Sequence, residues 1–178
     1  SPVFVHQTTI QESTIYAATE KGIYTADLTN PNLIDFNNWT QPQGAFIGNF
    51  NAISSFNFGV YPSKSNILLK ILGLNSLQQI TSYSDEILDL KSSEDFLTVT
   101  SLKKSYVFNS ALNTVFTADQ SNTYDFSLHT AFAEQPHIYL GTTDFGILLN
   151  TLTGVAYQEI HPEGPLSNQV FSIAAENE

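Results

Sequence analysis

The sequence predicts an all-β fold built from a repeated antiparallel unit, and three observations support this expectation. Apolar and polar residues alternate in short runs separated by turns, as they do in half-buried strands. Only 13% of residues are charged, and the chain has 13 Phe and 8 Tyr, a composition that favours strands joined by polar turns. A similar stretch recurs near both ends of the chain. We find no persistent amphipathic run of helical period.

The recurring stretch is clearest between "IYAATEKGIYTADL" (Ile15 to Leu28) and "IYLGTTDFGILLNTL" (Ile138 to Leu152). Both copies read Ile-Tyr-x-x-Thr, pass through a short polar turn and resume with Gly-Ile. Their starts are about 123 residues apart, or three units of about 41, and weaker copies begin near Phe56 and Phe96. A period of about 40 to 45 residues with only strands and turns is typical of a four-stranded propeller blade. We therefore expect a β-propeller of four-stranded antiparallel blades.

Four blades and the first strand of another are expected in a single propeller segment, 1–178. The approximate blades are 1–44, 45–84, 85–120 and 121–163, with the start of the next at 164–178. Strands are expected, blade by blade, in "VFVHQTTI", "TIYAAT", "GIYTADL" and an outer edge at 38–41; in "FNAISSFN", "SNILLKIL" and "LQQITSY"; in "EILDLKS", "DFLTVTS", "SYVFNSA" and "NTVFTAD"; and in "DFSLHTAFA", "HIYLGTT", "GILLNTL" and "AYQEIH". The turn-forming "PEGPLSN" leads to "QVFSIAA", the strand that opens the fifth unit. An incomplete ring would have an exposed flank that favours self-association.

Four residues of the strong repeats are expected to have structural roles. Gly22 and Gly146 supply the positive φ that a tight turn requires. Thr19 and Thr142 are expected to bond to neighbouring backbone in the same turns. These residues mark the fold and not the chemistry.

Charge and composition exclude several functions. The chain has 6 basic and 17 acidic residues and a formal net charge of −11, which argues against nucleic acid or an anionic membrane surface as a partner. No apolar run approaches the length of about 20 residues that crosses a bilayer, so we expect no membrane insertion of this segment. The absence of cysteine excludes disulfides, thiolate catalysis and Cys-based metal sites.

Residues that could carry catalysis or hold a metal are scattered along the sequence. The four histidines His6, His129, His137 and His161 form no HxH or HExxH pair, so we expect neither a metal nor another cofactor. The acidic residues Asp85, Glu86, Asp89, Glu94 and Asp95 lack the order of a calcium loop and are interpreted as a solvated rim. There is no G-x-S-x-G element around a serine. We therefore expect the chain not to be an enzyme.

The single tryptophan, Trp39, is the strongest candidate for an interaction residue, together with Phe36. With Tyr16, Tyr24 or Phe36 nearby, it could stack on a sugar ring, because aromatic faces offer apolar area beside a polar group. The alternative, which we favour, is that Trp39 fills the gap between adjacent sheets.

Several segments are similar to known propeller families. "GPLSNQVFSIAAENE" (Gly164 to Glu178) resembles the repeat of the two-component regulator propellers, with Pro165-Leu166 where Leu-Pro is usual. Taken with "IYAATEKGIYTADLTNPNLIDFNNWT" (Ile15 to Thr40) and "IYLGTTDFGILL", it resembles the propeller part of the PorZ-type accessory proteins of the bacterial type IX secretion system. The segment from Ala45 to Gln120 carries no such signature.

The PorZ-type resemblance implies a non-enzymatic scaffold in the periplasm or at the outer-membrane surface of a Gram-negative bacterium. The whole protein would have two propellers and a C-terminal β domain, and would assist a sortase that attaches secreted cargo to anionic lipopolysaccharide. The negative charge of this segment argues for contact with protein partners, such as the sortase or another secretion component, over contact with that glycan. The regulator resemblance implies instead an oligosaccharide-sensing propeller. A third alternative, a glycan-cleaving propeller, requires two carboxylates about 5 to 10 Å apart.

Overall fold

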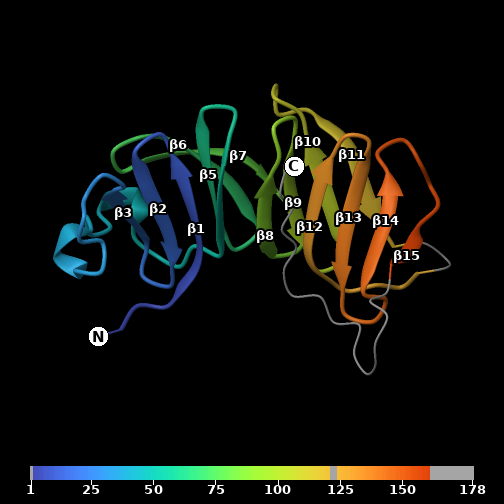
Figure 1. Ribbon diagram of the computed structural model, residues 1–178, viewed down its shortest axis with the longest axis horizontal. Coiled ribbons are helices and arrows are strands. Elements are labelled where there is room, and N and C mark those ends of the chain that lie inside the picture. Colours follow the sequence, from blue (N-terminus) through green and yellow to red (C-terminus); the bar gives the residue numbers. More distant parts are fainter. Residues whose placement is uncertain (1, 121–123, 161–178) are drawn as a thin grey trace. The chain divides into compact units, whose positions relative to one another are not determined.

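The computed structural model describes residues 2–120 and 124–160, and it confirms the prediction of an all-β fold. The chain divides into two compact units, residues 1–87 and 88–178. Each unit holds two antiparallel sheets that follow one another along the chain (Figure 1). The expected fifth unit, with "QVFSIAA", lies outside the described residues.

The first unit contains a three-stranded and a four-stranded sheet. The first sheet consists of β1 (Val5–Gln11), β2 (Thr14–Thr19) and β3 (Ile23–Asp27), in that order. The second sheet consists of β4 (Ala52–Phe56), β5 (Gly59–Lys64), β6 (Ile67–Gly73) and β7 (Ser76–Ser82), also in chain order. Strands that are neighbours in sequence are therefore neighbours in each sheet, as short hairpin connections require.

These two sheets share an apolar core. Ala18 and Ile23 of the first sheet cluster with Ile53 and Val60 of the second, and all four are buried. Phe50, from the segment that joins the sheets, is completely buried in the same cluster. Burial of apolar surface stabilises this contact by roughly 25 cal/mol per Å².

Hydroxyl and amide side chains complete the contact between the two inner strands. The Ser55 N–H donates to Thr9 Oγ1 at 2.9 Å, and the Ile53 N–H donates to Gln7 Oε1 at 3.2 Å. Ser55 and Ile53 lie on β4, which is an edge strand of its sheet. Side chains of the first sheet thus satisfy backbone donors that β5 does not pair.

The second unit repeats this arrangement with two four-stranded sheets. The third sheet consists of β8 (Ile87–Ser92), which begins at the boundary between the units, β9 (Leu97–Ser101), β10 (Lys104–Phe108) and β11 (Thr114–Asp119). The fourth sheet consists of β12 (Leu128–Glu134), β13 (His137–Thr142), β14 (Ile147–Thr151) and β15 (Gln158–Ile160). Val107 and Ala118 of the third sheet pack against Ala133 and Ile138 of the fourth. The Ala133 N–H donates to Thr98 Oγ1 at 3.2 Å, as Ser55 does to Thr9 in the first unit.

One expected strand is absent and one observed strand was missed. The outer edge expected at 38–41 is no strand, because only Thr40 pairs with Thr25 in an isolated bridge. Strand β5 was not expected from the sequence, and it contains Pro62, which has no backbone N–H to donate to a neighbouring strand. Pro62 is accommodated because it lies opposite Ile53, while pairing between β5 and β6 is limited to two residues near the turn.

The tip of the β4–β5 hairpin is a two-residue turn formed by Asn57 and Phe58. Both residues have positive φ, 44° and 58°, the combination found in type I′ turns. The Phe58 side chain is 92% exposed. An aromatic residue at this position therefore covers little of the protein.

Helical structure is minor in the described part of the chain. It consists of two 3-10 turns, η1 (Phe36–Asn38) and η2 (Gly44–Phe46). Across residues 2–120 and 124–160, no helix has the length and apolar character needed to span a membrane.

Candidate interaction site

The segment between β3 and η2 is held by side chains that bond to its own backbone. Asp27 Oδ1 accepts from the hydroxyl of Thr29 at 2.7 Å and from its N–H at 2.8 Å. These two bonds, that from the hydroxyl first, hold the pKa of Asp27 below its usual value. Asp35 caps η1 by accepting from the Asn37 N–H at 2.9 Å. Such local bonds give an irregular loop a defined conformation.

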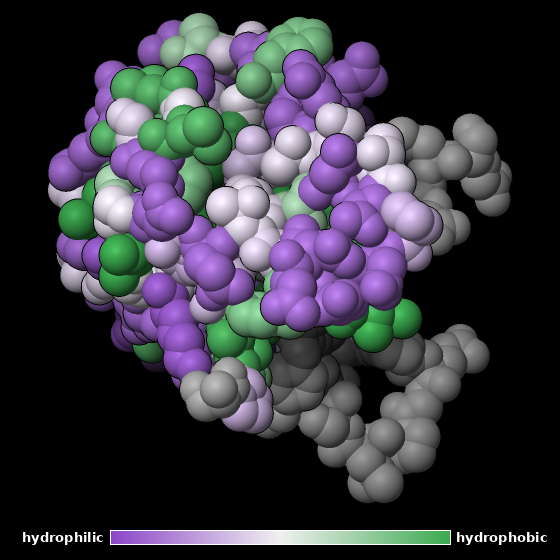
Figure 2. All heavy atoms as spheres, turned by 90° about the vertical axis from the view of Figure 1, so that its left-hand side faces the viewer, coloured by the Kyte–Doolittle hydropathy of each residue, from purple (hydrophilic) through white to green (hydrophobic). Residues whose placement is uncertain are grey.

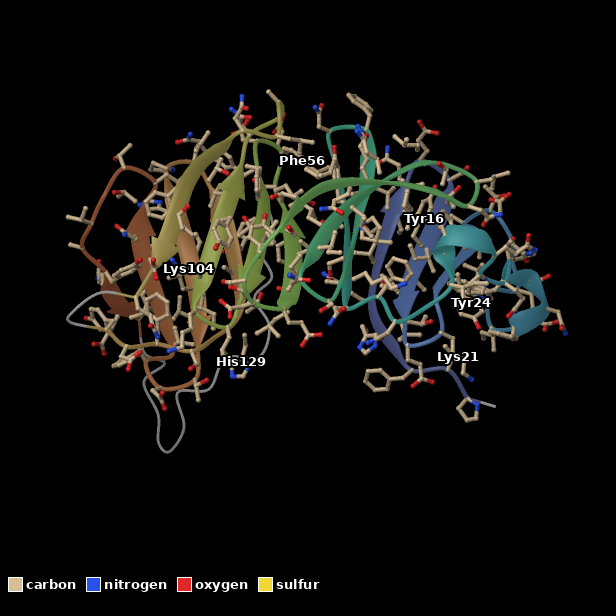
Figure 3. All side chains as sticks on the ribbon, turned by 180° about the vertical axis from the view of Figure 1, so that it is seen from behind. Tyr16, Lys21, Tyr24, Phe56, Lys104 and His129 are labelled. Carbon is tan, nitrogen blue, oxygen red and sulfur yellow. The ribbon has the colours of Figure 1, made fainter. Side chains whose placement is uncertain are left out.

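Aromatic side chains gather where this loop meets β3. Trp39 Nε1 donates to the Leu33 carbonyl at 2.9 Å, which fixes the indole ring against the loop. Tyr24, which is buried, lies beside η1 in Figure 3, and its ring centroid is 5.6 Å from that of Phe36. Phe36 is 51% exposed and Ile34, farther along the loop, is 98% exposed. The loop therefore presents apolar groups to solvent from a fixed backbone.

These rings form one wall of a pocket of about 430 Å³, called here the aromatic pocket. Its lining residues are Pro2, Val3, Val5, Thr8, Ala17, Thr19, Tyr24, Phe36 and Trp39. The side of the first unit that carries η1 exposes green apolar residues between purple hydrophilic ones (Figure 2). The described lining residues of the pocket are mostly apolar, which suits the binding of an apolar group.

The structure brings Tyr24 and Phe36 to Trp39 but separates Tyr16 from them. Successive residues of a strand point to opposite faces, and Ala17 lines the aromatic pocket while Tyr16 packs against the core shared with the second sheet. Trp39 therefore lies outside the gap between the first two sheets. The first sheet and its loop hold it on the face turned away from the second sheet.

The repeat residues lie in two similar turns. Thr19 Oγ1 donates to the Gly22 carbonyl at 2.7 Å and accepts from the Gly22 N–H at 3.0 Å. Thr142 Oγ1 donates to the Gly146 carbonyl at 3.0 Å and accepts from the Phe145 N–H at 3.0 Å. Both threonines are buried, so each hydroxyl replaces water for backbone groups of its turn.

The histidines are dispersed. Nε2 of His6 lies 3.1 Å from Asn49 Oδ1, and Nε2 of His129 lies 3.0 Å from Thr143 Oγ1. His161 lies outside the described residues. Within the described ranges, no three metal-ligating side chains come together.

The acidic residues around β8 have local partners. Glu86 accepts from the Asn51 amide, and Asp89 accepts from the Thr130 hydroxyl. Asp89 lies within β8, while the other acidic residues lie in the turns that flank it. The arrangement offers no converging set of carboxylates.

Sequence reasoning missed the contribution of the first residues to the aromatic pocket. Val3 and Val5, two positions apart and therefore on the same side of an extended segment, line the pocket together with Trp39. The alternation was a visible signal, but nothing in the sequence related it to a loop more than thirty residues away.

Comparison with solved structures identifies the architecture. The chain superimposes on the extracellular domain of the putative hybrid two-component system BT4673 from B. thetaiotaomicron with a TM-score of 0.68 and 14% identity, covering 96% of this chain and 24% of that one. It superimposes on PorZ, a surface component of the type IX secretion system of Porphyromonas gingivalis, with a TM-score of 0.69 and 12% identity, covering 91% and 22%. The WD40 β-propeller domain of Doa1 gives a TM-score of 0.63 at 12% identity, covering 83% and 51%.

These likenesses show the fold. The chain is a β-propeller segment.

The segment spans about a quarter of the length of the BT4673 and PorZ chains. No family model and no curated protein matches the sequence. At these low sequence identities the comparisons establish the architecture of this chain but say nothing of its activity.

Proposed function

We propose that the segment belongs to a non-enzymatic propeller scaffold that binds protein partners outside the cytoplasm, in a type IX secretion or surface-attachment complex. The loop beside the aromatic pocket supports this role, because Ile34 and Phe36 expose apolar area on a backbone held by hydrogen bonds. Aromatic residues on a preorganised surface are typical of the centres of protein interfaces. The secretion setting rests on the PorZ-type sequence segments and the shared architecture.

Charge supports protein over anionic glycan as the partner. The net charge of −11 opposes the approach of a polyanion, whereas an apolar loop binds a protein surface without charge matching. Saturable, calcium-independent binding of anionic polysaccharide would contradict this choice.

The test is site-specific photocrosslinking of the full-length protein in its own cells. A photoreactive residue at Ile34, which is 98% exposed on the loop, is expected to capture a protein of the secretion complex. The matched control is the same residue at Phe58, which is 92% exposed on the β4–β5 turn and is expected to capture none. Equal labelling from both positions, or no protein adduct from Ile34, would refute the role of the loop.

A second candidate function is oligosaccharide sensing for a two-component regulator. One observation favours it: Phe36 and Trp39 line an open apolar pocket suited to a sugar ring. Because Trp39 is the single tryptophan, neutral oligosaccharides can be titrated against its fluorescence. Saturable quenching that Phe36→Ala abolishes would favour sensing, and an unchanged spectrum would favour the scaffold.

A further inference from the structure

The face of the first sheet that is turned away from the second sheet is called here the open face. It carries Thr8 and Ile10 of β1, Ile15 and Ala17 of β2, and Tyr24 of β3, and it forms the floor of the aromatic pocket. Ile10 is 50% exposed. An apolar sheet face of this kind is normally covered in a folded protein.

Three inner strands can be compared position by position because each enters a two-residue turn. The closing pairs are Gln11 with Thr14, Phe56 with Gly59, and Glu134 with His137. Counting back from these pairs, Ile10 is equivalent to Ser55 and to Ala133. The Ser55 side chain accepts a hydrogen bond from Thr9 of the first sheet at 3.1 Å, and the Ala133 side chain packs in the core shared with the third sheet. The open face of the first sheet therefore corresponds to the face by which the second sheet packs against the first, and to the face by which the fourth sheet packs against the third.

The outer face of the fourth sheet corresponds to the face of the first sheet that packs against the second. Its Tyr139 is equivalent to Tyr16 in the repeat, and Tyr16 packs against the core shared with the second sheet. Tyr139 pairs with Phe132 and Leu149 on the face turned away from the third sheet, and all three are only partly buried.

The same side of the fourth sheet has a cavity of its own. This cavity has a volume of about 360 Å³ and is lined by His137, Leu149 and Val155 among others. Val155 is 93% exposed. A concave apolar surface thus accompanies the partly buried Tyr139.

We propose that the open face docks the fourth sheet of a second copy of this chain, with Tyr139 and Leu149 seated against the aromatic pocket. The chain already forms this type of sheet-on-sheet contact twice, between the first and second sheets and between the third and fourth. A second copy supplies the two surfaces that a third such contact requires. The contact is heterologous, since two different surfaces meet. It is independent of the protein partner proposed above, which engages the loop tip at Ile34.

Static light scattering of the chain across concentration tests the proposal, together with Trp39 emission. The mass of the wild-type chain is expected to rise with concentration above that of the monomer, while the Trp39 emission shifts to shorter wavelength because docking removes water from the pocket. Ile10→Lys and Val155→Lys place a charge on either half of the interface, and each is expected to weaken association at least tenfold. Leu74→Lys is the control, since Leu74 is 92% exposed on the β6–β7 turn and the charge change is the same.

Mixing the two interface variants distinguishes this contact from a symmetric one. In the mixture one undamaged open face meets one undamaged fourth sheet, so a mixed dimer is expected although neither variant associates alone. A folded wild-type chain that stays monomeric overturns the proposal. So does association that either interface variant leaves unchanged, or a mixture that stays monomeric. Circular dichroism of each variant establishes that it is folded.

Discussion

Replacing Gly22 by alanine is expected to destabilise the first unit far more than the same change at Gly146 destabilises the second. The two glycines occupy the same position of the sequence repeat, but their backbones differ: φ is 149° at Gly22 and 67° at Gly146. A Cβ at Gly22 would lie 2.4 Å from the Phe46 carbonyl oxygen and 2.5 Å from Cβ of Pro42. These distances are well inside van der Waals contact.

The expected loss of stability in each variant depends on how much of the backbone an added Cβ would displace. At Gly146 an alanine adopts the left-handed region, at a cost of about 1 to 2 kcal/mol. At Gly22 the backbone strain is about 1 to 3 kcal/mol, and the main chain at Phe46 must also shift. Phe46 is buried in the core, and Gly22 bridges to Ile47. Adding a loss of packing of about 1 to 3 kcal/mol gives a total of about 4 kcal/mol.

Urea denaturation measures how much each variant lowers the free energy of unfolding. Trp39 fluorescence reports on the first unit, which contains it, and far-UV circular dichroism reports on both. Gly146→Asn is a useful control, because asparagine tolerates the left-handed region and should cost less than alanine there. If Gly22→Ala lowered the free energy of unfolding no more than Gly146→Ala, the argument from the close approach of Phe46 would be wrong.

Three further predictions concern single hydroxyl groups. Thr19→Val should destabilise the first unit by about 2 to 3 kcal/mol in urea denaturation, since the buried Gly22 N–H and Gly22 carbonyl each lose a hydrogen bond to the hydroxyl. Burial raises the pKa of Tyr157. Its contribution to stability is therefore complete below about pH 10, where the unfolded residue titrates, and is lost as pH rises through the folded pKa. Thermal melts of Tyr157→Phe should accordingly change less at alkaline pH than those of the wild type. Thr29→Val should raise the pKa of Asp27 toward its usual value in an NMR titration, because the largest cause of the lowered pKa is removed. The stability linked to Asp27 is present above its usual pKa and is lost as pH falls through the folded pKa.

Each of these predictions has a matched control. Thr19→Ser keeps the hydroxyl and should lose less stability than Thr19→Val; an equal loss in the two variants would contradict the role assigned to the hydroxyl. Tyr106→Phe removes a different tyrosine hydroxyl, and an alkaline profile identical to that of Tyr157→Phe would contradict the role of burial at Tyr157. An unchanged Asp27 titration in Thr29→Val would mean that the backbone N–H alone lowers the pKa.

Much of the fold could be predicted because strand alternation and hairpin turns are local signals. The strands of the third and fourth sheets follow the expected segments closely, as β9 and β13 illustrate. Strand β5 was not predicted; Pro62 is compatible with a sheet only in a particular register, and register depends on the partner strand.

The candidate site could be predicted only in part. Trp39 and Phe36 are conspicuous in the sequence, and the structure places both in the aromatic pocket. The sequence could not indicate which neighbouring tyrosine joins them, since Tyr16 and Tyr24 lie on strands whose faces are fixed only by pairing. Val3 lines the same pocket as Trp39, another long-range juxtaposition that the sequence does not reveal.

At the turn formed by Asn57 and Phe58, the fold does not require the phenylalanine side chain. Phe58 adopts a conformation that favours glycine and is 92% exposed, so Phe58→Gly would complete the preferred Asn-Gly turn and cost no packing. Selection for stability therefore does not maintain this phenylalanine. The hairpin tip is accordingly a position at which a fluorophore, an epitope or an inserted peptide can be attached while the sheet beneath it stays intact.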